Sequence, residues 1–158
     1  MNSPYDVLIV KKPRRSCIGC YRSLLVPFDG SDSSQKALSR ACDLMKIDGG
    51  EITVLYVIPR YEEMMDFFKT ETIQRSLYQA AEKITEGAKK IASAQGVQIT
   101  AVVQEGHSSD KIVEIAGMLK SDLIVMGTHG WRGMSKAMMG STAERIIAYA
   151  FCPILVVR

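Results

Sequence analysis

The residues best placed to do chemistry are glycines near the end of the chain. Gly127-Thr-His-Gly130 is followed, after nine residues, by Gly140-Ser141-Thr142. The apolar run Asp122-Leu-Ile-Val-Met126 precedes these glycines, and residues 143–150 carry apolar side chains at helical spacing. A strand, a glycine-rich loop and a helix in this order direct unpaired N–H groups and the positive end of a helix dipole to one point. Because glycine lets an anion approach the backbone, the pattern predicts a phosphate-binding loop.

This loop differs from two common phosphate-binding motifs. No Gly-Lys-Ser/Thr follows it, as in a Walker loop, and its spacing is not the GxGxxG of a dinucleotide fingerprint. Ser141-Thr-Ala-Glu144 has the spacing of a capping box, which predicts that the Ser141 hydroxyl and N–H lie at the start of a helix.

The elements that position the loop alternate regularly along the chain. Apolar runs predict strands, and apolar positions at helical spacing predict the helices between them. We expect caps at Ser31 or Ser33 for the first helix and at Ser108 or Ser109 for the third. A further, weaker strand candidate spans residues 5–10. The five main predicted strands are residues 23–28, 52–58, 97–104, 123–126 and 153–157.

Strict alternation of this kind favours an α/β fold: a five-stranded parallel open sheet with helices on both faces, Rossmann-like in class. Ligands of such sheets bind at the carboxyl ends of strands, where the winding reverses. Asp29, Val57 and Gly127 all lie at or just past predicted strand ends. The sequence therefore predicts that residues far apart along the chain meet at one edge of the sheet.

Composition places the chain among globular proteins of one main domain. The 158 residues are 47% hydrophobic and 23% charged, and no apolar run is long enough to span a bilayer. Residues 1–22 hold five basic side chains and one acidic, so we expect a basic N-terminal arm followed by one domain over residues 23–158. Because the rest of the chain is near neutral, the net charge of +3 does not favour nucleic-acid binding by the fold. The lack of a secretory signal pattern predicts a cytoplasmic protein.

The four cysteines divide into two kinds. Cys42 and Cys152 stand in apolar surroundings and are predicted core residues. Cys17-Ile-Gly-Cys20 is a lone CxxC without the further ligands that a zinc site needs. It is an incidental pair, a redox or interchain disulfide, or part of a metal site shared between subunits.

At this point the sequence resembles the universal stress protein family. The resemblance covers residues 23–158 and rests on Val26-Pro-Phe-Asp-Gly-Ser31, on the glycine pattern that ends at Gly140-Ser141, and on residues 143–157. Glycines at this spacing with a following serine are typical of the ATP-binding branch of that family. The resemblance implies the adenine nucleotide alpha hydrolase-like version of the fold, and it implies ATP, held with Mg²⁺ or Mn²⁺, as the ligand.

The same resemblance assigns roles to individual positions. Asp29 would contact the ribose with Pro27 beside it, and the Val57 backbone would meet the adenine edge. The ribose and α-phosphate would be lined by Met126, Gly127, His129 and Gly130. The β- and γ-phosphates would be held by Gly140, Ser141 and Thr142.

Each of these residues also has a purely structural interpretation. Asp29 is alternatively a turn residue before a helix cap, and the loop glycines are alternatively turn residues. Gly140-Ser141 is alternatively only a helix start, and His129 is more often a loop residue than a general base. No metal ligands and no catalytic base stand out, so we expect at most slow ATP hydrolysis.

The leading hypothesis is therefore a stress-response protein that acts as an ATP-dependent switch. The resemblance also implies a homodimer through the C-terminal strand, because an edge strand with unpaired backbone invites pairing, and a protein partner of unknown identity. The alternative is a dimeric interaction module that binds AMP or no nucleotide, which Trp131 and the methionines around it favour. Oxidant sensing by Cys17 and Cys20 and nucleic-acid binding by residues 11–15 are further alternatives.

Overall fold

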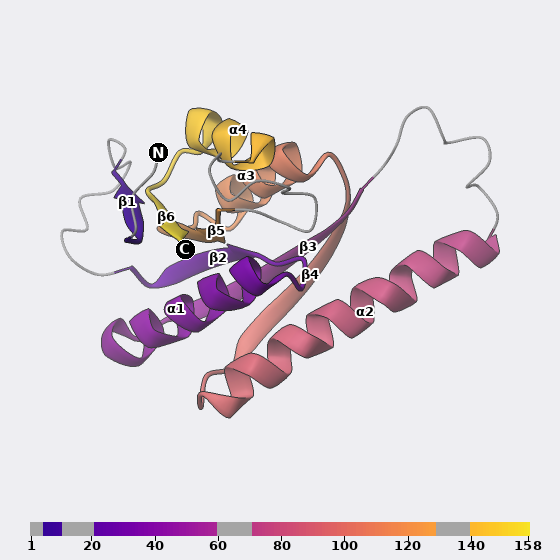
Figure 1. Cartoon of the computed structure of the whole chain (residues 1–158), viewed down its shortest axis with the longest axis horizontal. Helices are drawn as coiled ribbons and strands as arrows, with labels where there is room; N and C mark the ends of the chain where they lie inside the picture. Colours follow the sequence, from indigo (N-terminus) through magenta and orange to yellow (C-terminus); the bar gives the residue numbers. More distant parts are fainter. Residues whose placement is uncertain (1–4, 11–20, 60–70, 129–139) are drawn as a thin grey trace.

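The computed structural model describes residues 5–10, 21–59, 71–128 and 140–158. Six strands and four helices lie within these ranges (Figure 1). The strands are β1 (Val7–Ile9), β2 (Ser23–Pro27), β3 (Glu51–Pro59), β4 (Ile99–Gly106), β5 (Leu123–Gly127) and β6 (Ile154–Val157). The helices are α1 (Asp32–Asp48), α2 (Glu71–Ala94), α3 (Ser108–Met118) and α4 (Ser141–Tyr149).

All six strands form one sheet in the order β1-β6-β5-β2-β3-β4. The five strands from β2 to β6 are parallel to one another, as predicted. The α/β class with an open, mostly parallel sheet is confirmed, and the sheet has six strands because β1 adds to it in the antiparallel direction.

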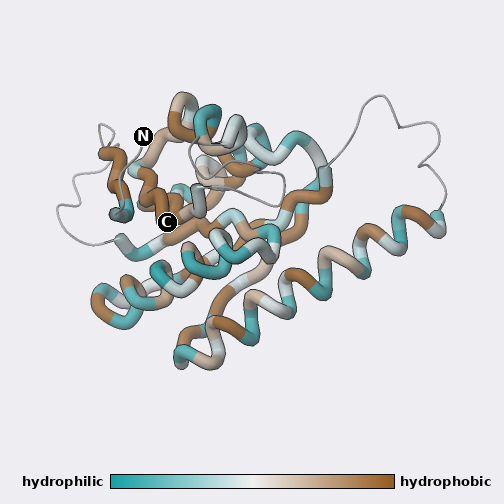
Figure 2. The backbone as a smooth tube through the Cα atoms, viewed as in Figure 1, coloured by the Kyte–Doolittle hydropathy of each residue, from teal (hydrophilic) through white to brown (hydrophobic). Residues whose placement is uncertain are grey.

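Helices cover both faces of the sheet. On one face, α1 and α2 pack over a core that includes Leu24, Val26 and Val54, and on the other α3 and α4 pack over Leu25, Leu55 and Ile124. Because neighbouring residues of β2 serve opposite cores, Leu24, Leu25 and Val26 are all buried, which explains the continuous apolar run. The central strands are mostly hydrophobic, whereas hydrophobic and hydrophilic residues alternate along the helices (Figure 2).

The core confirms the prediction for two cysteines. Cys42 is fully buried on α1, and Cys152 is buried just before β6, and both are free thiols. Burial raises the pKa of the Cys42 thiol above its ordinary value, with the nearby Lys46 acting against this shift.

The ends of the helices confirm one predicted cap and correct another. Ser31 caps α1, and its side chain accepts a hydrogen bond from the Ser34 N–H at 3.3 Å. The cap of α3 is His107, not Ser108 or Ser109 as expected, and no side-chain hydrogen bond is made at this cap. The Ser109 hydroxyl lies instead 2.9 Å from Nδ1 of His107, inside the first turn.

The position of β1 removes one of the two grounds on which a homodimer was expected, the open edge of the C-terminal strand, and leaves the family resemblance as the other. The prediction assumed that the C-terminal strand is an edge of the sheet with unpaired backbone groups. In the structure β1 lies against β6, and its residues Val7, Leu8 and Ile9 pair with residues of β6. The strand candidate at residues 5–10 is thus a real strand, and the first part of the arm belongs to the sheet.

Within the part of the chain that the structure describes, no helix combines the length and apolar character needed to cross a membrane. The longest, α2, is 24 residues long but buries only a narrow stripe, at Ala81, Thr85, Ala88 and Ala92.

Candidate functional site at the carboxyl ends of β2, β3 and β5

Three neighbouring strands end at the edge of the sheet where the candidate residues were predicted. β5, β2 and β3 are adjacent and parallel, so Gly127, Pro27 and Val57 lie at the same edge. After β2 the chain continues through α1 to β3, and after β5 it continues through α4 to β6, on the opposite side. The winding therefore reverses between β2 and β5, which is where open α/β sheets bind ligands.

Asp29 sits in the turn that joins β2 to α1. Its Oδ1 accepts hydrogen bonds from the Ser31 N–H at 3.0 Å and from the Ser31 hydroxyl at 2.5 Å. The Ser31 oxygen in turn caps α1, so the carboxylate helps to hold the start of that helix. Oδ1 of Asp29 therefore has the structural role of a turn residue before a helix cap, which was one of the two interpretations of this residue. The side chain is only half-buried, which is compatible with an additional contact to a ligand.

Tyr56 was not among the site residues predicted from the sequence, yet its phenol interacts electrostatically with the Asp29 carboxylate. Burial raises the pKa of the Tyr56 phenol above its ordinary value, and the negative charge of Asp29 raises it further. A hydroxyl directly before Val57, at the end of a strand on the predicted edge, was the signal that could have found it. Tyr56 thus adds a neutral hydrogen-bonding group to this side of the site.

Val57 contributes backbone rather than side chain. The register of β2 with β3 ends at Pro27 and Leu55, and the Phe28 N–H donates to the Leu55 carbonyl at 2.9 Å. Backbone groups of alternate residues point to opposite neighbours in a sheet, so the N–H and C=O of Val57 point, like those of Leu55, to the side that β2 has left. The side chain of Val57 is buried in the core. This is the geometry of a strand that can offer its edge to a planar polar ring.

Met126 and Gly127 end β5 in different ways. The Met126 side chain is buried in the core shared with α3 and α4, so any ligand contact there would come from its backbone. Gly127 lies so close to α1 that a Cβ on it would be 2.7 Å from backbone and side-chain atoms of Ser33. The absence of a side chain at Gly127 therefore serves the packing of α1 against β5.

Gly140 is the N-cap of α4, and the predicted capping box is not formed. Ser141 and Thr142 are the first two helical residues, one position later than a capping serine. The cap makes no side-chain hydrogen bond, because glycine has no acceptor to offer. The Glu144 N–H donates to the Gly140 carbonyl at 3.1 Å, which is the first hydrogen bond of the helix. The N–H groups of Ser141, Thr142 and Ala143 precede the first intrahelical bond and point out of the helix end.

A chain of contacts joins α1 to the start of α4. Gly127 touches Ser33 near the start of α1, and the next residue, Thr128, accepts a hydrogen bond from the Gly140 N–H at 3.4 Å. The N-termini of two helices and the Asp29 turn therefore converge around the end of β5. Both helix dipoles present positive charge there, which suits an anion.

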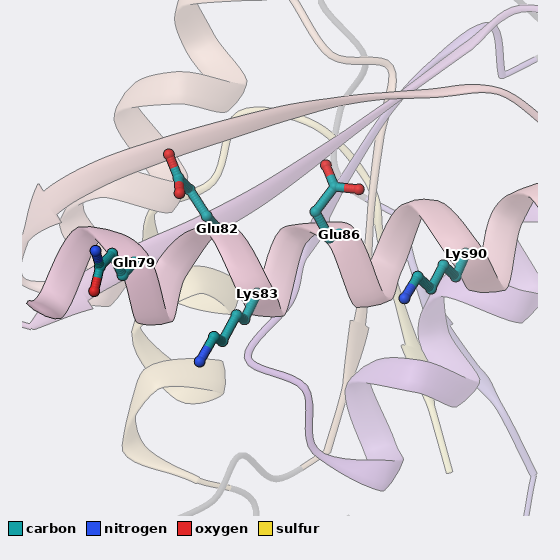
Figure 3. A pocket seen from close by; sticks show the side chains of 5 residues that line it. All are labelled: Gln79, Glu82, Lys83, Glu86 and Lys90. Carbon is teal, nitrogen blue, oxygen red and sulfur yellow. The ribbon is translucent and has the colours of Figure 1, made fainter.

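Several predicted residues lie outside the described part of the chain. These are His129, Gly130, Trp131 with the methionines around it, Cys17, Cys20 and residues 11–15. Among the described residues, no cluster of three or more His, Cys, Asp or Glu side chains is placed to hold a metal ion. A hollow on the surface of α2, lined by Gln79, Glu82, Lys83, Glu86 and Lys90, contains none of the predicted residues (Figure 3).

Comparison with known proteins decides the family. The model of the universal stress protein family matches residues 21–158. The chain belongs to the universal stress protein family. Universal stress protein MJ0531 of Methanocaldococcus jannaschii is 36% identical over 140 residues, which cover 87% of this chain and 82% of that protein.

Solved structures of universal stress proteins share the fold described above. Hypothetical protein MJ0577 superimposes with a TM-score of 0.77 at 28% identity, over 87% of this chain and 95% of that one. A universal stress protein in complex with cAMP has a TM-score of 0.70 at 24% identity, over 89% and 99% of the chains. One from Archaeoglobus fulgidus in complex with dAMP has a TM-score of 0.66 at 20% identity, over 87% and 98%. These proteins therefore include binders of adenine nucleotides.

Proposed function

We propose that this universal stress protein binds ATP at the edge formed by β2, β3 and β5 and acts as a nucleotide-dependent switch. The observation that carries the proposal is the start of α4. Gly140 offers no side-chain cap to the first N–H groups of α4, and among the described residues the atom nearest to a Cβ on it would be the Thr128 carbonyl oxygen, at 3.8 Å. No described contact requires a glycine there, whereas a phosphate against the backbone would.

The parts of the site suit the parts of the nucleotide. In this proposal Gly140 lets the β- and γ-phosphates approach the backbone closely, and Ser141 and Thr142 hold them through their N–H groups. Asp29 accepts from the ribose hydroxyls with Pro27 beside it, and the Val57 backbone meets the adenine edge. Contacts of the ribose and α-phosphate with Met126 and Gly127 would be through backbone, and those with His129 and Gly130 rest on the family resemblance alone.

In this proposal Mg²⁺ or Mn²⁺ binds together with the nucleotide. Mg²⁺ is commonly held by substrate phosphates and water with few protein ligands, so the ion would arrive with the nucleotide. We propose at most slow ATP hydrolysis, because no base for an attacking water beside a pair of metal ligands stands out in the sequence.

The second candidate is a dimeric interaction module that binds AMP or no nucleotide. The relatives in complex with cAMP and dAMP favour it, because each of those ligands carries one phosphate rather than three. The two candidates differ in what the start of α4 binds: its N–H groups hold the β- and γ-phosphates of ATP, whereas with AMP both of these positions are left to water.

Isothermal titration calorimetry separates them. Nucleotide-free protein is titrated with ATP, with AMP and with GTP, each with and without Mg²⁺. The ATP proposal predicts tighter binding of ATP than of AMP, and weak binding of GTP because the Val57 edge is matched to adenine. Equal or tighter binding of AMP favours the second candidate. If neither ATP nor AMP gives a heat of binding, the proposal is wrong. Mass spectrometry of small molecules released on denaturation gives an independent check.

A homodimer, a protein partner and a cytoplasmic location belong to the same proposal and rest on the family resemblance. Pairing of two copies through β6 requires that β1 leave its place in the sheet, because β1 now occupies that edge.

A further inference from the structure

β4 is an outer strand of the sheet, at the end opposite to β1 and β6. It pairs with β3 residue by residue from Ile99 to Gly106, without a bulge. Within the described part of the chain, no strand lies on its other side. β4 is eight residues long, whereas β1 at the opposite edge has three, so β4 presents the longer edge of the sheet.

Alternate residues of β4 direct their backbone groups away from β3. The Phe28 N–H donates to the Leu55 carbonyl, so the backbone of Leu55 faces β2 and that of the next residue, Tyr56, faces β4. Tyr56 is aligned with Val103, and in a parallel pair the residue aligned with a bonded one faces away. In steps of two from Val103, the residues whose N–H and C=O groups point outward are therefore Ile99, Ala101, Val103 and Glu105.

The sequence of β4 lacks the usual devices that prevent pairing at an edge. Natural edge strands are commonly short or bulged, or they carry lysine or proline. Residues 99–104 read Ile-Thr-Ala-Val-Val-Gln, a stretch that is rich in β-branched residues and has no charge and no proline. Glu105 is charged, but its carboxylate accepts a hydrogen bond from the Tyr78 hydroxyl of α2 at 2.5 Å. A long, regular and uncharged edge of this kind is a template for a further strand.

The backbone of β4 is complementary to that of a second copy. In an antiparallel pair centred on Val102, Ala101 of one copy lies opposite Val103 of the other, and Ile99 lies opposite Glu105. Each outward residue then faces an outward residue, which is the condition for the two to exchange hydrogen bonds. This register therefore uses all the outward backbone groups of both strands.

The side chains favour the same register. Val102 meets Val102 of the second copy, and Thr100 meets Gln104, so apolar residues face apolar ones and polar residues face polar ones. Moving the centre by one residue would place Val102 opposite Thr100 or opposite Gln104. The pattern of β4 thus selects one register among its neighbours.

The charges of α2 suit an antiparallel arrangement as well. Glu82 and Lys89 follow Tyr78 at helical spacing, so they lie on the side of α2 that reaches β4 through Glu105. Glu82 and Glu86 project from the same side of the helix (Figure 3). Antiparallel copies would bring Glu82 of one α2 towards Lys89 of the other, and the exposed pair that Lys89 now forms with Glu86 can exchange partners.

The two helices would also fit side by side. α2 lies over both β3 and β4. Because paired strands are about 4.8 Å apart, the α2 helices of two copies would be about 10 Å apart, which is an ordinary distance between packed helices.

We propose that two copies of this chain pair through β4, in the antiparallel register centred on Val102, and so join their sheets. This edge is at the other end of the sheet from β6, so a contact through β6 would be a separate interface. The proposal does not depend on nucleotide binding, and its failure would leave the ATP proposal standing.

Two double variants of the full-length chain test the register. Thr100→Glu with Gln104→Glu places like charges opposite each other across the pair, whereas Thr100→Lys with Gln104→Glu places opposite charges there. Both positions are polar and neither is buried, so one chain is expected to fold with either change, as equal urea midpoints would show. Sedimentation equilibrium is expected to give a dissociation constant at least about tenfold higher for the first variant than for the second.

Amide hydrogen exchange of the unaltered protein locates the contact. The N–H groups of Ala101 and Val103 point outward and are expected to gain protection as the protein concentration rises. Those of Val102 and Gln104 face β3 and are expected to be protected at every concentration. A pair formed through β6 instead would leave the exchange of Ala101 and Val103 unchanged.

Two results would overturn the proposal. One is equal self-association of the two double variants, since a pair in this register must distinguish like from opposite charges. The other is exchange of the Ala101 and Val103 amides that does not slow up to millimolar protein concentration, because the outward edge of β4 would then stay unpaired.

Discussion

Ser33 occupies the space that a side chain on Gly127 would need. A Cβ on Gly127 would lie 2.7 Å from the carbonyl carbon, the carbonyl oxygen and the Cβ of Ser33. At Gly140 the nearest atom of the described residues to such a Cβ is the Thr128 carbonyl oxygen at 3.8 Å, an ordinary contact. The two glycines of the predicted phosphate loop therefore differ. Gly127 is required by the packing of α1 against β5, whereas the space next to Gly140 is open to a ligand.

Gly127→Ala is expected to lower the free energy of unfolding by about 1–3 kcal/mol, because α1 or β5 must shift to admit the methyl group. Urea denaturation monitored by circular dichroism measures the loss. Gly140→Ala is the matched control and should lower the free energy of unfolding by less than about 1 kcal/mol, which is the difference between the typical costs of alanine and of glycine at an N-cap. Equal losses in the two variants would contradict the distinction.

Gly140→Val is expected to abolish ATP binding while the protein remains folded. The backbone at Gly140 has φ −69° and ψ 148°, a conformation that valine adopts readily. The branched side chain would fill the space proposed for the phosphates. Calorimetric titration with ATP measures the effect, and the urea midpoint shows that the fold persists. Full ATP affinity in Gly140→Val would show that the phosphates lie elsewhere.

Asp29→Asn is expected to weaken ATP binding about tenfold or more. The amide oxygen can still accept from the Ser31 N–H and hydroxyl, so the start of α1 is kept. The amide nitrogen cannot accept from a ribose hydroxyl, and a lost hydrogen bond to a charged group is worth about 1.5–3 kcal/mol. Titration with ATP measures this loss against the unaltered protein.

The same variant has a readout that needs no nucleotide. The charge of Asp29 contributes to the raised pKa of Tyr56, so the pKa of this phenol should fall in Asp29→Asn while burial still keeps it above the ordinary value. Nuclear magnetic resonance of labelled tyrosine rings follows the titration. An unchanged Tyr56 pKa would mean that the phenol and the carboxylate do not sense each other.

Stability is expected to fall as the pH rises above about 9, in part because of Cys42. Burial raises the pKa of this thiol in the folded state above its ordinary value of 9.0. Below that value both states keep the proton and the thiol has no effect. Above it the unfolded chain loses the proton first, so the unfolded state gains stability as the pH rises.

Urea midpoints at pH 8 and pH 10 measure this dependence for the unaltered protein and for Cys42→Ala. The variant has a smaller core side chain and starts from a lower stability, but its midpoint should fall less between the two pH values. An identical fall in both proteins would remove Cys42 as a cause.

Local patterns were sufficient to predict the parallel strands and their helices. Leu24, Leu25 and Val26 are consecutive apolar residues because both faces of β2 are covered, and such a run is visible without any tertiary information. Parallel strands of one sheet end at the same edge, so the edge that carries Asp29, Val57 and Gly127 could also be predicted, whereas the strand order that places the reversal of winding between β2 and β5 came from the structure. The predicted capping box failed because Gly140 and Ser141 can each begin a helix, and the hydrogen bond from the Gly140 N–H to Thr128 is a tertiary contact.

The sequence by itself determined the family, the α/β class and the edge of the sheet at which the candidate residues lie. It did so because strand periodicity, helix periodicity and glycine spacing are properties of neighbouring residues. Only the tertiary structure decided that Gly127 makes room for Ser33, that Tyr56 lies near Asp29, and that β1 closes the edge of β6. Each of these depends on contacts between segments far apart in the chain, and their residue types would fit other partners equally well.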